Sequence, residues 1–441
     1  MDVIKDKPLR VFTAYAVPAV FGMLAISSAT VVDGFFVGNY VGAIGLAAIN
    51  ISMPIFSILF GLALMLAIGA SVISGKLMAE GDTKSASLIF SKTVVSIVIL
   101  SFSIAGLIYL NMNAIIDIFE PPADLKVLVV TYLSLMLIFI PFLMSGIVLD
   151  YFVKIDSQPL FAFYALLFSS LINIVLDYLL IVYLEKGLFG AALATGISQA
   201  SLIFILLPHF FSKRATIRFV KPLGSFKVIL HACFNGASEF VNETSVGITT
   251  IIFNYIMMQS FGVDGVAAYT VVNYMLWIAL MISFGISDSL PSIISKNFGA
   301  KETQRMNTFL KYAFISVLIS GVLLMSFVLI YPEILVEIFL ESQDAKTIAI
   351  VIAFLSIVWP VFLFNGSNLV ISAYLTSIHK PLPSAIIALT RSLILPVVFI
   401  LVLPKFLGDN GLYLAIVCAE FFTLIIALYL FKKFRPETLT T

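Results

Sequence analysis

The chain has 441 residues, of which 61% are hydrophobic and only 11% are charged, and its mean hydropathy is +1.12. Soluble domains carry about 25% charged residues, so this composition excludes a soluble protein and points to lipid as the solvent. The net charge of +1 argues against a nucleic-acid partner. The absence of metal-ligand, phosphate-loop and nucleophile motifs argues against an enzyme or a bound cofactor.

Long apolar stretches divide the sequence into candidate membrane spans. A span needs enough apolar residues to cross roughly 30 Å of hydrocarbon. Its backbone amides must be satisfied within the segment, which predicts helices rather than open strands. We therefore expect an all-α integral membrane protein with twelve transmembrane helices, near 11–40, 47–74, 88–110, 125–150, 160–184, 188–211, 226–259, 267–293, 310–333, 345–375, 384–404 and 411–432.

Basic residues predict the direction of these spans. Twenty of the 25 lysines and arginines lie at the termini and in alternate loops, whereas the opposite loops hold four. By the positive-inside rule, both termini should be cytoplasmic, and residues 111–124 and 334–345 should face outward. We expect a multi-pass protein of the cell (inner) membrane, and a monomer.

A weak internal repeat appears when residues 41–86 are laid over 261–306 with a constant shift of 220. The shift pairs Gly42 with Gly262 and Asp82 with Glu302. It predicts two six-helix bundles, related as parallel repeats about an axis normal to the membrane, with a central cleft. The expected domains are an N-lobe (1–211), a cytoplasmic linker (212–227) and a C-lobe (228–435).

Two carboxylates inside the spans lack counterparts in the second half. Shifted by 220, Asp33 falls on Phe253 and Asp177 falls on Val397. An ionisable residue inside a membrane is a functional candidate by default. The alternative interpretation is a carboxylate at a helix end that reaches interfacial water.

The predicted helix directions bring further oxygen atoms to the depth of these acids. Asn173 precedes Asp177 by one helical turn, on the same face, and Thr195 falls at a similar depth on the next span. Two carboxylates, an amide and a hydroxyl suit a hard cation such as Na⁺, and two neighbouring acids suit a shared proton. We therefore predict a cation or proton site at Asp33, Asn173, Asp177 and Thr195.

A polar run, SEFVNETS, opens the seventh span. Glu239 and Glu243 share one helical face, and Asn242 lies beside them. These side chains either bind a cationic substrate from the cytoplasmic side or line a water-filled cleft. The sequence leaves both interpretations open.

Four further residues stand out inside or at the ends of spans. Asp288 lies near the end of the eighth span, and Arg391 and Glu420 lie within the last two. Arg391 and Glu420 could form a structural pair, but the roles of these three residues stay open. Pro18 lies inside the first span, where it removes one backbone hydrogen bond and should weaken or bend the helix.

The chain resembles the multidrug and toxic compound extrusion (MATE) transporters over almost its whole length. The similar features are Pro18, the segment VDGFFVGNYVGAIGLAA, NIVLDYLLI in the fifth span, AALATGISQ in the sixth, and the twelve-helix double repeat. The resemblance implies an antiporter that exports cationic or amphipathic drugs by alternating access, coupled to H⁺ or Na⁺. It implies a cation site at Asp33, Asn173, Asp177 and Thr195, and bending of the first helix at Pro18.

Two other functions remain as alternatives. One is a flippase for a lipid-linked oligosaccharide or peptidoglycan precursor of the same superfamily, although Arg391 is the only arginine inside a span to meet an anionic substrate. The other is a non-transporting receptor or an embedded aspartyl protease. Asp33 and Asp177 lack the glycine-aspartate motif that such a protease needs.

Overall fold

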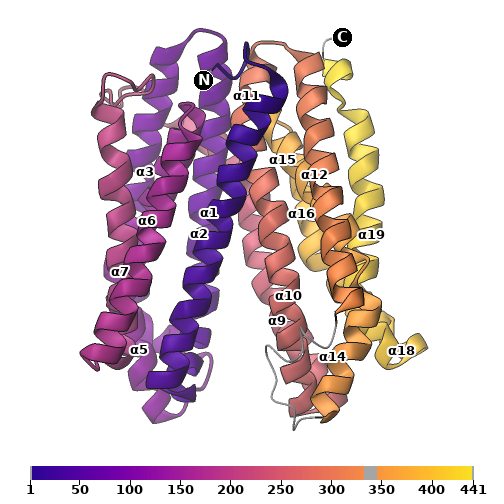
Figure 1. Ribbon diagram of the computed structural model, residues 1–441. Coiled ribbons are helices and arrows are strands. Elements are labelled where there is room, and N and C mark those ends of the chain that lie inside the picture. The colour runs from indigo at the N-terminus through magenta and orange to yellow at the C-terminus, as the bar shows by residue number, and fades with distance from the viewer. Residues whose placement is uncertain (1, 332–344, 440–441) are drawn as a thin grey trace. The chain divides into compact units, whose positions relative to one another are not determined.

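The computed structural model describes residues 2–331 and 345–439, and no β-strand occurs among them. Most of the expected outer loop 334–345 therefore lies outside the described residues. The described chain forms two compact units, Phe21–Phe240 with the stretch up to Val3, and Ile4–Val20 with Val241–Thr441. Figure 1 shows long helices running roughly parallel within each unit.

Six spans make up the first unit. Its helices are α1 (Pro8–Tyr40, from Phe21 onward), α2 (Ala43–Ala79), α3 (Thr83–Leu110), α4 (Met112–Asp117), α5 (Ala123–Ile155), α6 (Pro159–Asp177), η1 (Tyr178–Tyr183), α7 (Gly187–Leu206), η2 (Leu207–Phe211) and α8 (Lys227–Asn235).

The second unit repeats this order. Its helices are α9 (Ala237–Phe261, from Val241 onward), α10 (Val263–Asp288), α11 (Leu290–Gly299), α12 (Thr303–Ile330), α14 (Ala345–Val358), α15 (Val361–Ser377), α16 (Pro381–Leu389), η3 (Thr390–Ile394), α17 (Leu395–Val402), α18 (Pro404–Leu407), α19 (Asp409–Lys433) and η4 (Pro436–Leu439).

The helices account for the twelve expected spans. Among the described residues, nine helical segments are long and apolar enough to cross a membrane. The pair α14 and α15, bent by 55°, makes a tenth. The helices α9 and α10 complete the set, and α9 is the less apolar because it opens with the run SEFVNETS. The predicted all-α membrane fold with six spans in each half is confirmed, whereas the cleft between the halves stays a prediction.

Equivalent helices pack in equivalent ways within the two units. In the first unit α5, the fourth span, packs against α2, α3 and α7. In the second unit α15 ends the fourth span and packs against α10, α12 and α19. Each bundle is therefore organised around its fourth span, as a repeat requires.

The turns between spans repeat as well. Gly42 and Gly262 open α2 and α10 with φ values of 89° and 69°, a region that favours glycine. Asp82 and Glu302 precede α3 and α12 with φ and ψ of −91° and 69° and of −86° and 68°, respectively. The shift of 220 seen in the sequence thus relates matching backbone conformations.

The chain passes from one unit to the other inside helices. The boundaries fall between Val20 and Phe21 in α1 and between Phe240 and Val241 in α9, which are 220 residues apart. We call residues 4–20 arm 1 and residues 227–240 arm 2. Each arm belongs to the unit opposite to that of the helix it leads into.

Arm 1 is held by the second unit through close contacts. Arg305 donates from Nη2 to the backbone oxygen of Asp6 at 2.7 Å. Near the end of the arm, Gly285 of α10 lies so close to Val20 that a Cβ on the glycine would be 2.5 Å from the Val20 Cα. The first part of α1 is therefore an integral part of the second bundle.

Arm 2 packs on α2 of the first unit just as closely. A Cβ on Gly236 would lie 2.0 Å from the backbone oxygen of Met65, and one on Gly69 would lie 1.9 Å from that of Ala232. Both contacts involve backbone atoms, which have little freedom to move aside. The two glycines therefore allow the backbones of arm 2 and α2 to touch.

The segment expected as a linker, 212–227, is fastened to the first unit. Arg218 and Val220 donate their backbone N–H groups to the hydroxyls of Ser87 and Ser91 on α3, at 3.2 and 2.9 Å. Lys92 donates to the backbone oxygen of Ser225 at 2.7 Å. The division into 1–211, 212–227 and 228–435 stays a prediction. The boundaries between the two compact units fall inside α1 and α9.

Candidate functional site

The two predicted acids lie in the first unit, Asp33 near the C-terminal end of α1 and Asp177 at the C-terminal end of α6. Asp33 lies two turns before the end of α1. Asp177 is the last residue of α6, is fully buried, and is followed directly by the π-helical turn η1. Turns of this kind widen the helix and often occur at functional sites.

The carboxyl groups of Asp33 and Asp177 lie within hydrogen-bonding reach of each other. Carboxylates without protons accept hydrogen bonds but donate none. Accordingly Oδ1 of Asp33 and both carboxylate oxygens of Asp177 are buried and receive no donor from the described residues. The pair therefore calls for a proton between the two carboxyls, or for a cation beside them.

Asn173 and Thr195 occupy matching levels on the neighbouring helices α6 and α7. Ser169 of α6 donates to the backbone oxygen of Ser198 at 2.7 Å, which sets the register of these antiparallel helices. Asn173 lies one turn after Ser169 on α6, and Thr195 lies one turn before Ser198 on α7. Because the helices are antiparallel, these two residues lie at the same level. The Nδ2 atom of Asn173 is buried without a partner in the described chain. A half-turn of this amide would present its oxygen instead.

One residue at this site was missed by the sequence analysis. Tyr132 of α5 is buried, and its hydroxyl interacts electrostatically with both Asp33 and Asp177. Its ring packs edge-on against Phe56, with the centroids 6.2 Å apart. A tyrosine hydroxyl can donate to a carboxylate. It carries no charge, however, so the pattern of charged residues within the spans does not indicate it.

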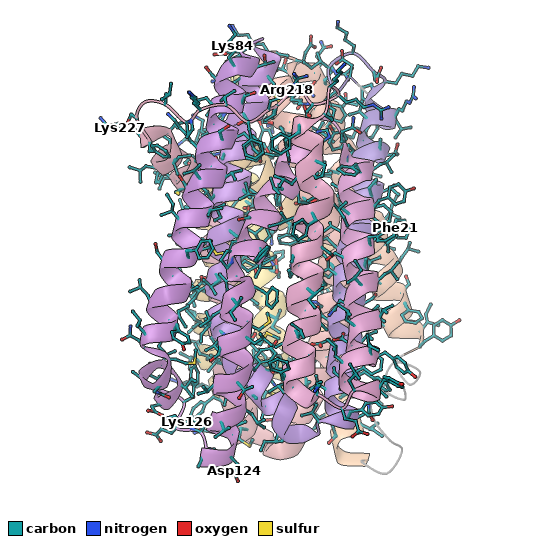
Figure 2. The ribbon with its side chains drawn as sticks, turned by 90° about the vertical axis from the view of Figure 1, so that its left-hand side faces the viewer. Phe21, Lys84, Asp124, Lys126, Arg218 and Lys227 are labelled. Carbon is teal, nitrogen blue, oxygen red and sulfur yellow. The ribbon has the colours of Figure 1, made fainter. Side chains whose placement is uncertain are left out.

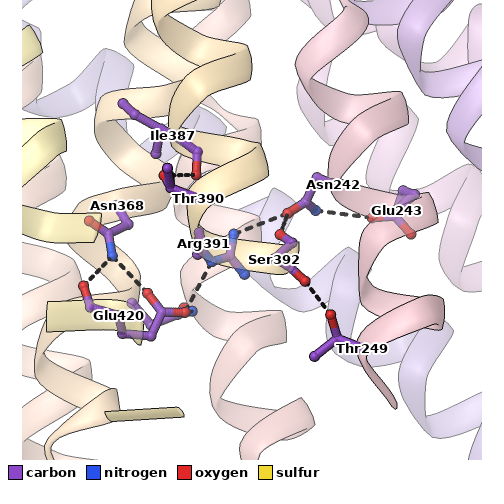
Figure 3. A network of polar contacts seen from close by, with 10 residues as sticks. Asn242, Glu243, Thr249, Asn368, Ile387, Thr390, Arg391, Ser392 and Glu420 are labelled. Atoms are coloured by element: carbon purple, nitrogen blue, oxygen red, sulfur yellow. Dashed lines mark hydrogen bonds and ion pairs between the residues drawn. The ribbon is translucent and has the colours of Figure 1, made fainter. Parts of the chain in front are cut away.

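The second unit holds a different polar cluster, shown in Figure 3. The Nε atom of Arg391 in η3 donates to Oε1 of Glu420 in α19 at 3.0 Å. Asn365 and Asn368 of α15 donate to Oε1 and Oε2 of the same carboxylate, each at 2.7 Å. The pairing of Arg391 with Glu420, suggested by the sequence, is confirmed.

Asn242, predicted as a possible substrate contact, is bound into this cluster. Its Oδ1 atom accepts from the Ser392 hydroxyl at 2.8 Å and from Nη1 of Arg391 at 3.3 Å. Its Nδ2 atom donates to Oε1 of Glu243 at 3.4 Å. Glu239 lies in arm 2 of the first unit. The structure thus connects Asn242 and Glu243 to each other and to η3.

Pro18 lies buried inside α1, which continues as one helix from Pro8 to Tyr40. The boundary between the two units falls less than one turn after it, between Val20 and Phe21. The position where the helix lacks a backbone hydrogen bond therefore adjoins the position where α1 passes from one bundle to the other.

The metal-binding potential of the described residues is limited. Among residues 2–331 and 345–439, no three His, Cys, Asp or Glu side chains gather in a way that could hold a metal ion. A cation at the first unit would depend on the two carboxylates together with amide, hydroxyl or water oxygens, the ligand types that hard cations prefer.

Comparisons with known proteins cover nearly the whole chain. The MatE family model matches residues 18–179 and 240–402. The multidrug export protein MepA of Staphylococcus haemolyticus (strain JCSC1435) is 24% identical over 424 residues, which are 96% of this chain and 92% of the relative.

Two solved structures share the fold. An outward-facing multidrug resistance MATE family transporter of the MOP superfamily matches with a TM-score of 0.93 at 19% identity, covering 100% of this chain and 98% of that one. A MOP superfamily transporter from Pyrococcus furiosus, described as having a binding pocket of reverse polarity, matches with the same score, identity and coverage.

Proposed function

Because this chain belongs to the MatE family, we propose that it exports cationic or amphipathic organic compounds by alternating access, driven by the entry of H⁺ or Na⁺. The MATE transporters are carriers rather than enzymes, and this chain is a multi-pass membrane protein. Its relatives are named for multidrug export, which supports the choice of cargo.

The observation that carries the proposal is the pair of facing acids in the first unit. Asp33 and Asp177 are brought together from α1 and α6, and three of their four carboxylate oxygens are buried without a donor in the described chain. An ion can drive transport only if it binds one conformation better than another. A proton or Na⁺ between these carboxyls would remove their repulsion, and would therefore favour the conformation that brings them together.

The flippase alternative has less support. An anionic pyrophosphate head group would need several uncompensated cations within the spans. The second-unit cluster offers a single arginine, Arg391, which falls short of that number, and the acids of the first unit would repel such a substrate. The acid pair favours cationic cargo instead.

Transport in reconstituted vesicles tests the proposal. The purified protein would be placed in proteoliposomes containing ethidium, and a pH gradient or a sodium gradient would be imposed separately. We expect one of the two gradients to accelerate ethidium efflux over that of protein-free vesicles. Equal efflux with and without each gradient would refute cation coupling.

We also propose that both termini and the 212–227 segment are cytoplasmic. Figure 2 shows Lys84, Arg218 and Lys227 at one end of the first unit, with Asp124 and Lys126 at the other. The larger number of basic residues at the first end supports its placement in the cytoplasm. Labelling of a Ser212→Cys variant in a background without Cys233 and Cys418 tests this, because only reagents that reach the cytoplasmic side should modify it.

A further inference from the structure

A partly open cavity of about 120 Å³ lies in the second unit and is lined by residues of α9, α10, α12, α15, η3, α17 and α19. Its wall is mostly apolar and includes the rings of Phe253, Tyr269 and Phe362. The rings of Phe253 and Tyr269 are stacked, with centroids 4.3 Å apart and an angle of 11° between their planes. Arg391 and Glu420 form part of the polar side of this wall.

This cavity occupies the position in the second repeat that corresponds to the acid pair in the first. The acid site draws on α1, α5, α6 and α7, which are the first, fourth, fifth and sixth spans of their unit. The cavity draws on α9, α15, η3 and α19, the same spans of the second unit, and in addition on α10 and α12. The polar residues of the two sites differ in charge, because the site in the second unit contains a cation, Arg391, and the acid pair of the first unit contains none.

The hydrogen bonds at this site leave donors in excess. Glu420 receives three donors, from Asn365, Asn368 and Nε of Arg391. A guanidinium group has five N–H bonds, and Arg391 uses Nε on Glu420 and one N–H of Nη1 on Asn242. Its other three N–H bonds donate to no acceptor within the described chain, and Arg391 lines the cavity. A ligand that brings acceptor oxygens can therefore bind to these N–H groups.

The size of the cavity limits what can enter. An engineered apolar cavity of about 150 Å³ is large enough to hold benzene. The cavity here, of about 120 Å³, is somewhat smaller and is partly open, so a single ring or the end of a larger molecule can occupy it with the rest of the molecule at the opening. Flat apolar walls that contain aromatic rings favour an aromatic guest.

We propose that this cavity is a binding site for an aromatic carboxylate, either a single-ring acid or the acid-bearing end of a larger amphipathic molecule. The carboxylate accepts hydrogen bonds from the Nη groups of Arg391, and the ring lies among Phe253, Tyr269 and Phe362. A planar guanidinium is well suited to a carboxylate, which it can bind through two parallel hydrogen bonds. The site rests on the proposed export function only in that the ligand is taken to be cargo.

Binding of three matched single-ring probes tests the site. Radiolabelled benzoate, benzamide and benzylamine share the ring but carry an anion, a neutral amide and a cation. Each is measured by equilibrium dialysis against the purified full-length protein in detergent, with empty micelles as the blank. We expect saturable binding of benzoate at one site per chain, weaker binding of benzamide, and no saturable binding of benzylamine. Benzoate that binds no better than benzylamine would overturn the proposal.

Two variants of the ion pair sharpen the test. Glu420→Gln removes the competing negative charge and keeps the shape, so it should tighten benzoate binding. Arg391→Gln combined with Glu420→Gln removes both charges of the ion pair together and keeps two polar side chains of similar size, so it should fold. We expect this double variant to bind benzoate at least about tenfold more weakly, since hydrogen bonds to charged groups contribute on this scale. Undiminished benzoate binding by the folded double variant would overturn the assignment to Arg391.

The experiments can distinguish a wrong proposal for this binding site from a wrong proposal for cation coupling. Benzoate binding is measured without any gradient and in a different unit from Asp33. Asp33→Asn should therefore bind benzoate normally even though its gradient-driven efflux is lost. If wild-type protein shows gradient-driven efflux but does not bind benzoate, the cavity proposal alone is wrong.

Discussion

The two units place polar side chains on corresponding spans, yet the charges there are arranged in different ways. In the first unit Asp33 and Asp177 face each other without a donor for most of their oxygens. In the second unit Glu420 receives three donors, and one of them is the guanidinium of Arg391. One repeat thus brings two carboxylates together, and the other pairs its carboxylate with a cation that is part of the chain.

The largest effect should come from removing an acid of the first unit. Asp33→Asn and Asp177→Asn each keep the size of the side chain but remove the charge that attracts H⁺ or Na⁺. We expect gradient-driven ethidium efflux to fall to the leak of protein-free vesicles, with expression close to that of the wild type. Wild-type efflux from both variants would show that the acid pair does not carry the coupling ion.

The same assay on acids outside the pair provides the matched control. Glu239→Gln and Glu243→Gln make an equivalent change in α9. They should alter the apparent affinity for the dye or have little effect, because the acid pair stays intact. If these variants stop transport while the aspartate variants do not, the coupling site belongs to α9.

The next largest effect should be on stability, at the internal ion pair. The side chains of Arg391 and Glu420 are 9% and 7% exposed, and Glu420→Ala would leave the guanidinium buried without a counter-ion. Loss of one partner of a buried pair costs about 3–5 kcal/mol. The unfolding temperature of the purified protein in mild detergent should therefore fall clearly. Glu420→Gln keeps an acceptor oxygen for Arg391 but no counter-charge, so it should restore only part of the loss.

A smaller loss is expected at the contact between arm 2 and α2. Gly236→Ala would place a Cβ 2.0 Å from the backbone oxygen of Met65, and such overpacking costs about 1–3 kcal/mol. Gly106→Ala in α3 is the control, because a Cβ there meets nothing within 4 Å. We expect the unfolding temperature to fall for Gly236→Ala and not to fall for Gly106→Ala. An equal response of both would mean that the backbones of arm 2 and α2 do not touch.

The smallest effect should be a pH-dependent one at the turn before α3. Hydrogen bonds from Ser85 hold the pKa of Asp82 below its usual value. Because the folded pKa is lowered, this cap stabilises the protein above the pKa of the unfolded state, and the contribution is lost as the pH falls through the folded pKa. Asp82→Ala should therefore lower the unfolding temperature slightly at neutral pH, and the difference should vanish in acid.

Glu302, the equivalent residue in the second repeat, tests whether the capping hydrogen bond or the position in the turn causes the change in unfolding temperature. The side chain of Glu302 makes no capping hydrogen bond to α12. Glu302→Ala should therefore change the unfolding temperature less than Asp82→Ala does at neutral pH. A larger change from Glu302→Ala would show that the turn, rather than the hydrogen bond from Ser85, determines the effect.

The spans and the acid pair could be predicted from the sequence for related reasons. Lipid tolerates few unpaired polar groups, so long apolar segments reveal the helices and rare charges within them reveal candidate sites. Asp33 and Asp177 stood out because the equivalent positions of the second half, 220 residues later, hold Phe253 and Val397. Both inferences depend on composition along the chain, which a single sequence contains.

What depends on helix rotation and packing could not be predicted in the same way. Tyr132 carries no charge, and only the orientation of α5 brings its hydroxyl to the acids. The sequence suggested the pairing of Arg391 with Glu420, but not the amides of Asn365 and Asn368 that complete it. The boundaries between the units fall inside the helices α1 and α9, with no turn or linker at either position, so nothing in the sequence marks where the chain leaves one bundle for the other.

The exchange of arms has a consequence for the protein expressed in two pieces. A chain cut at Gly224 would give one fragment that carries arm 1, which belongs to the bundle of the other fragment, and a second fragment that carries arm 2, which belongs to the bundle of the first. Neither fragment contains a whole bundle, and each would lose glycine-mediated backbone contacts. Such fragments should be degraded when made alone and should complement one another when made together, as interlocking halves do.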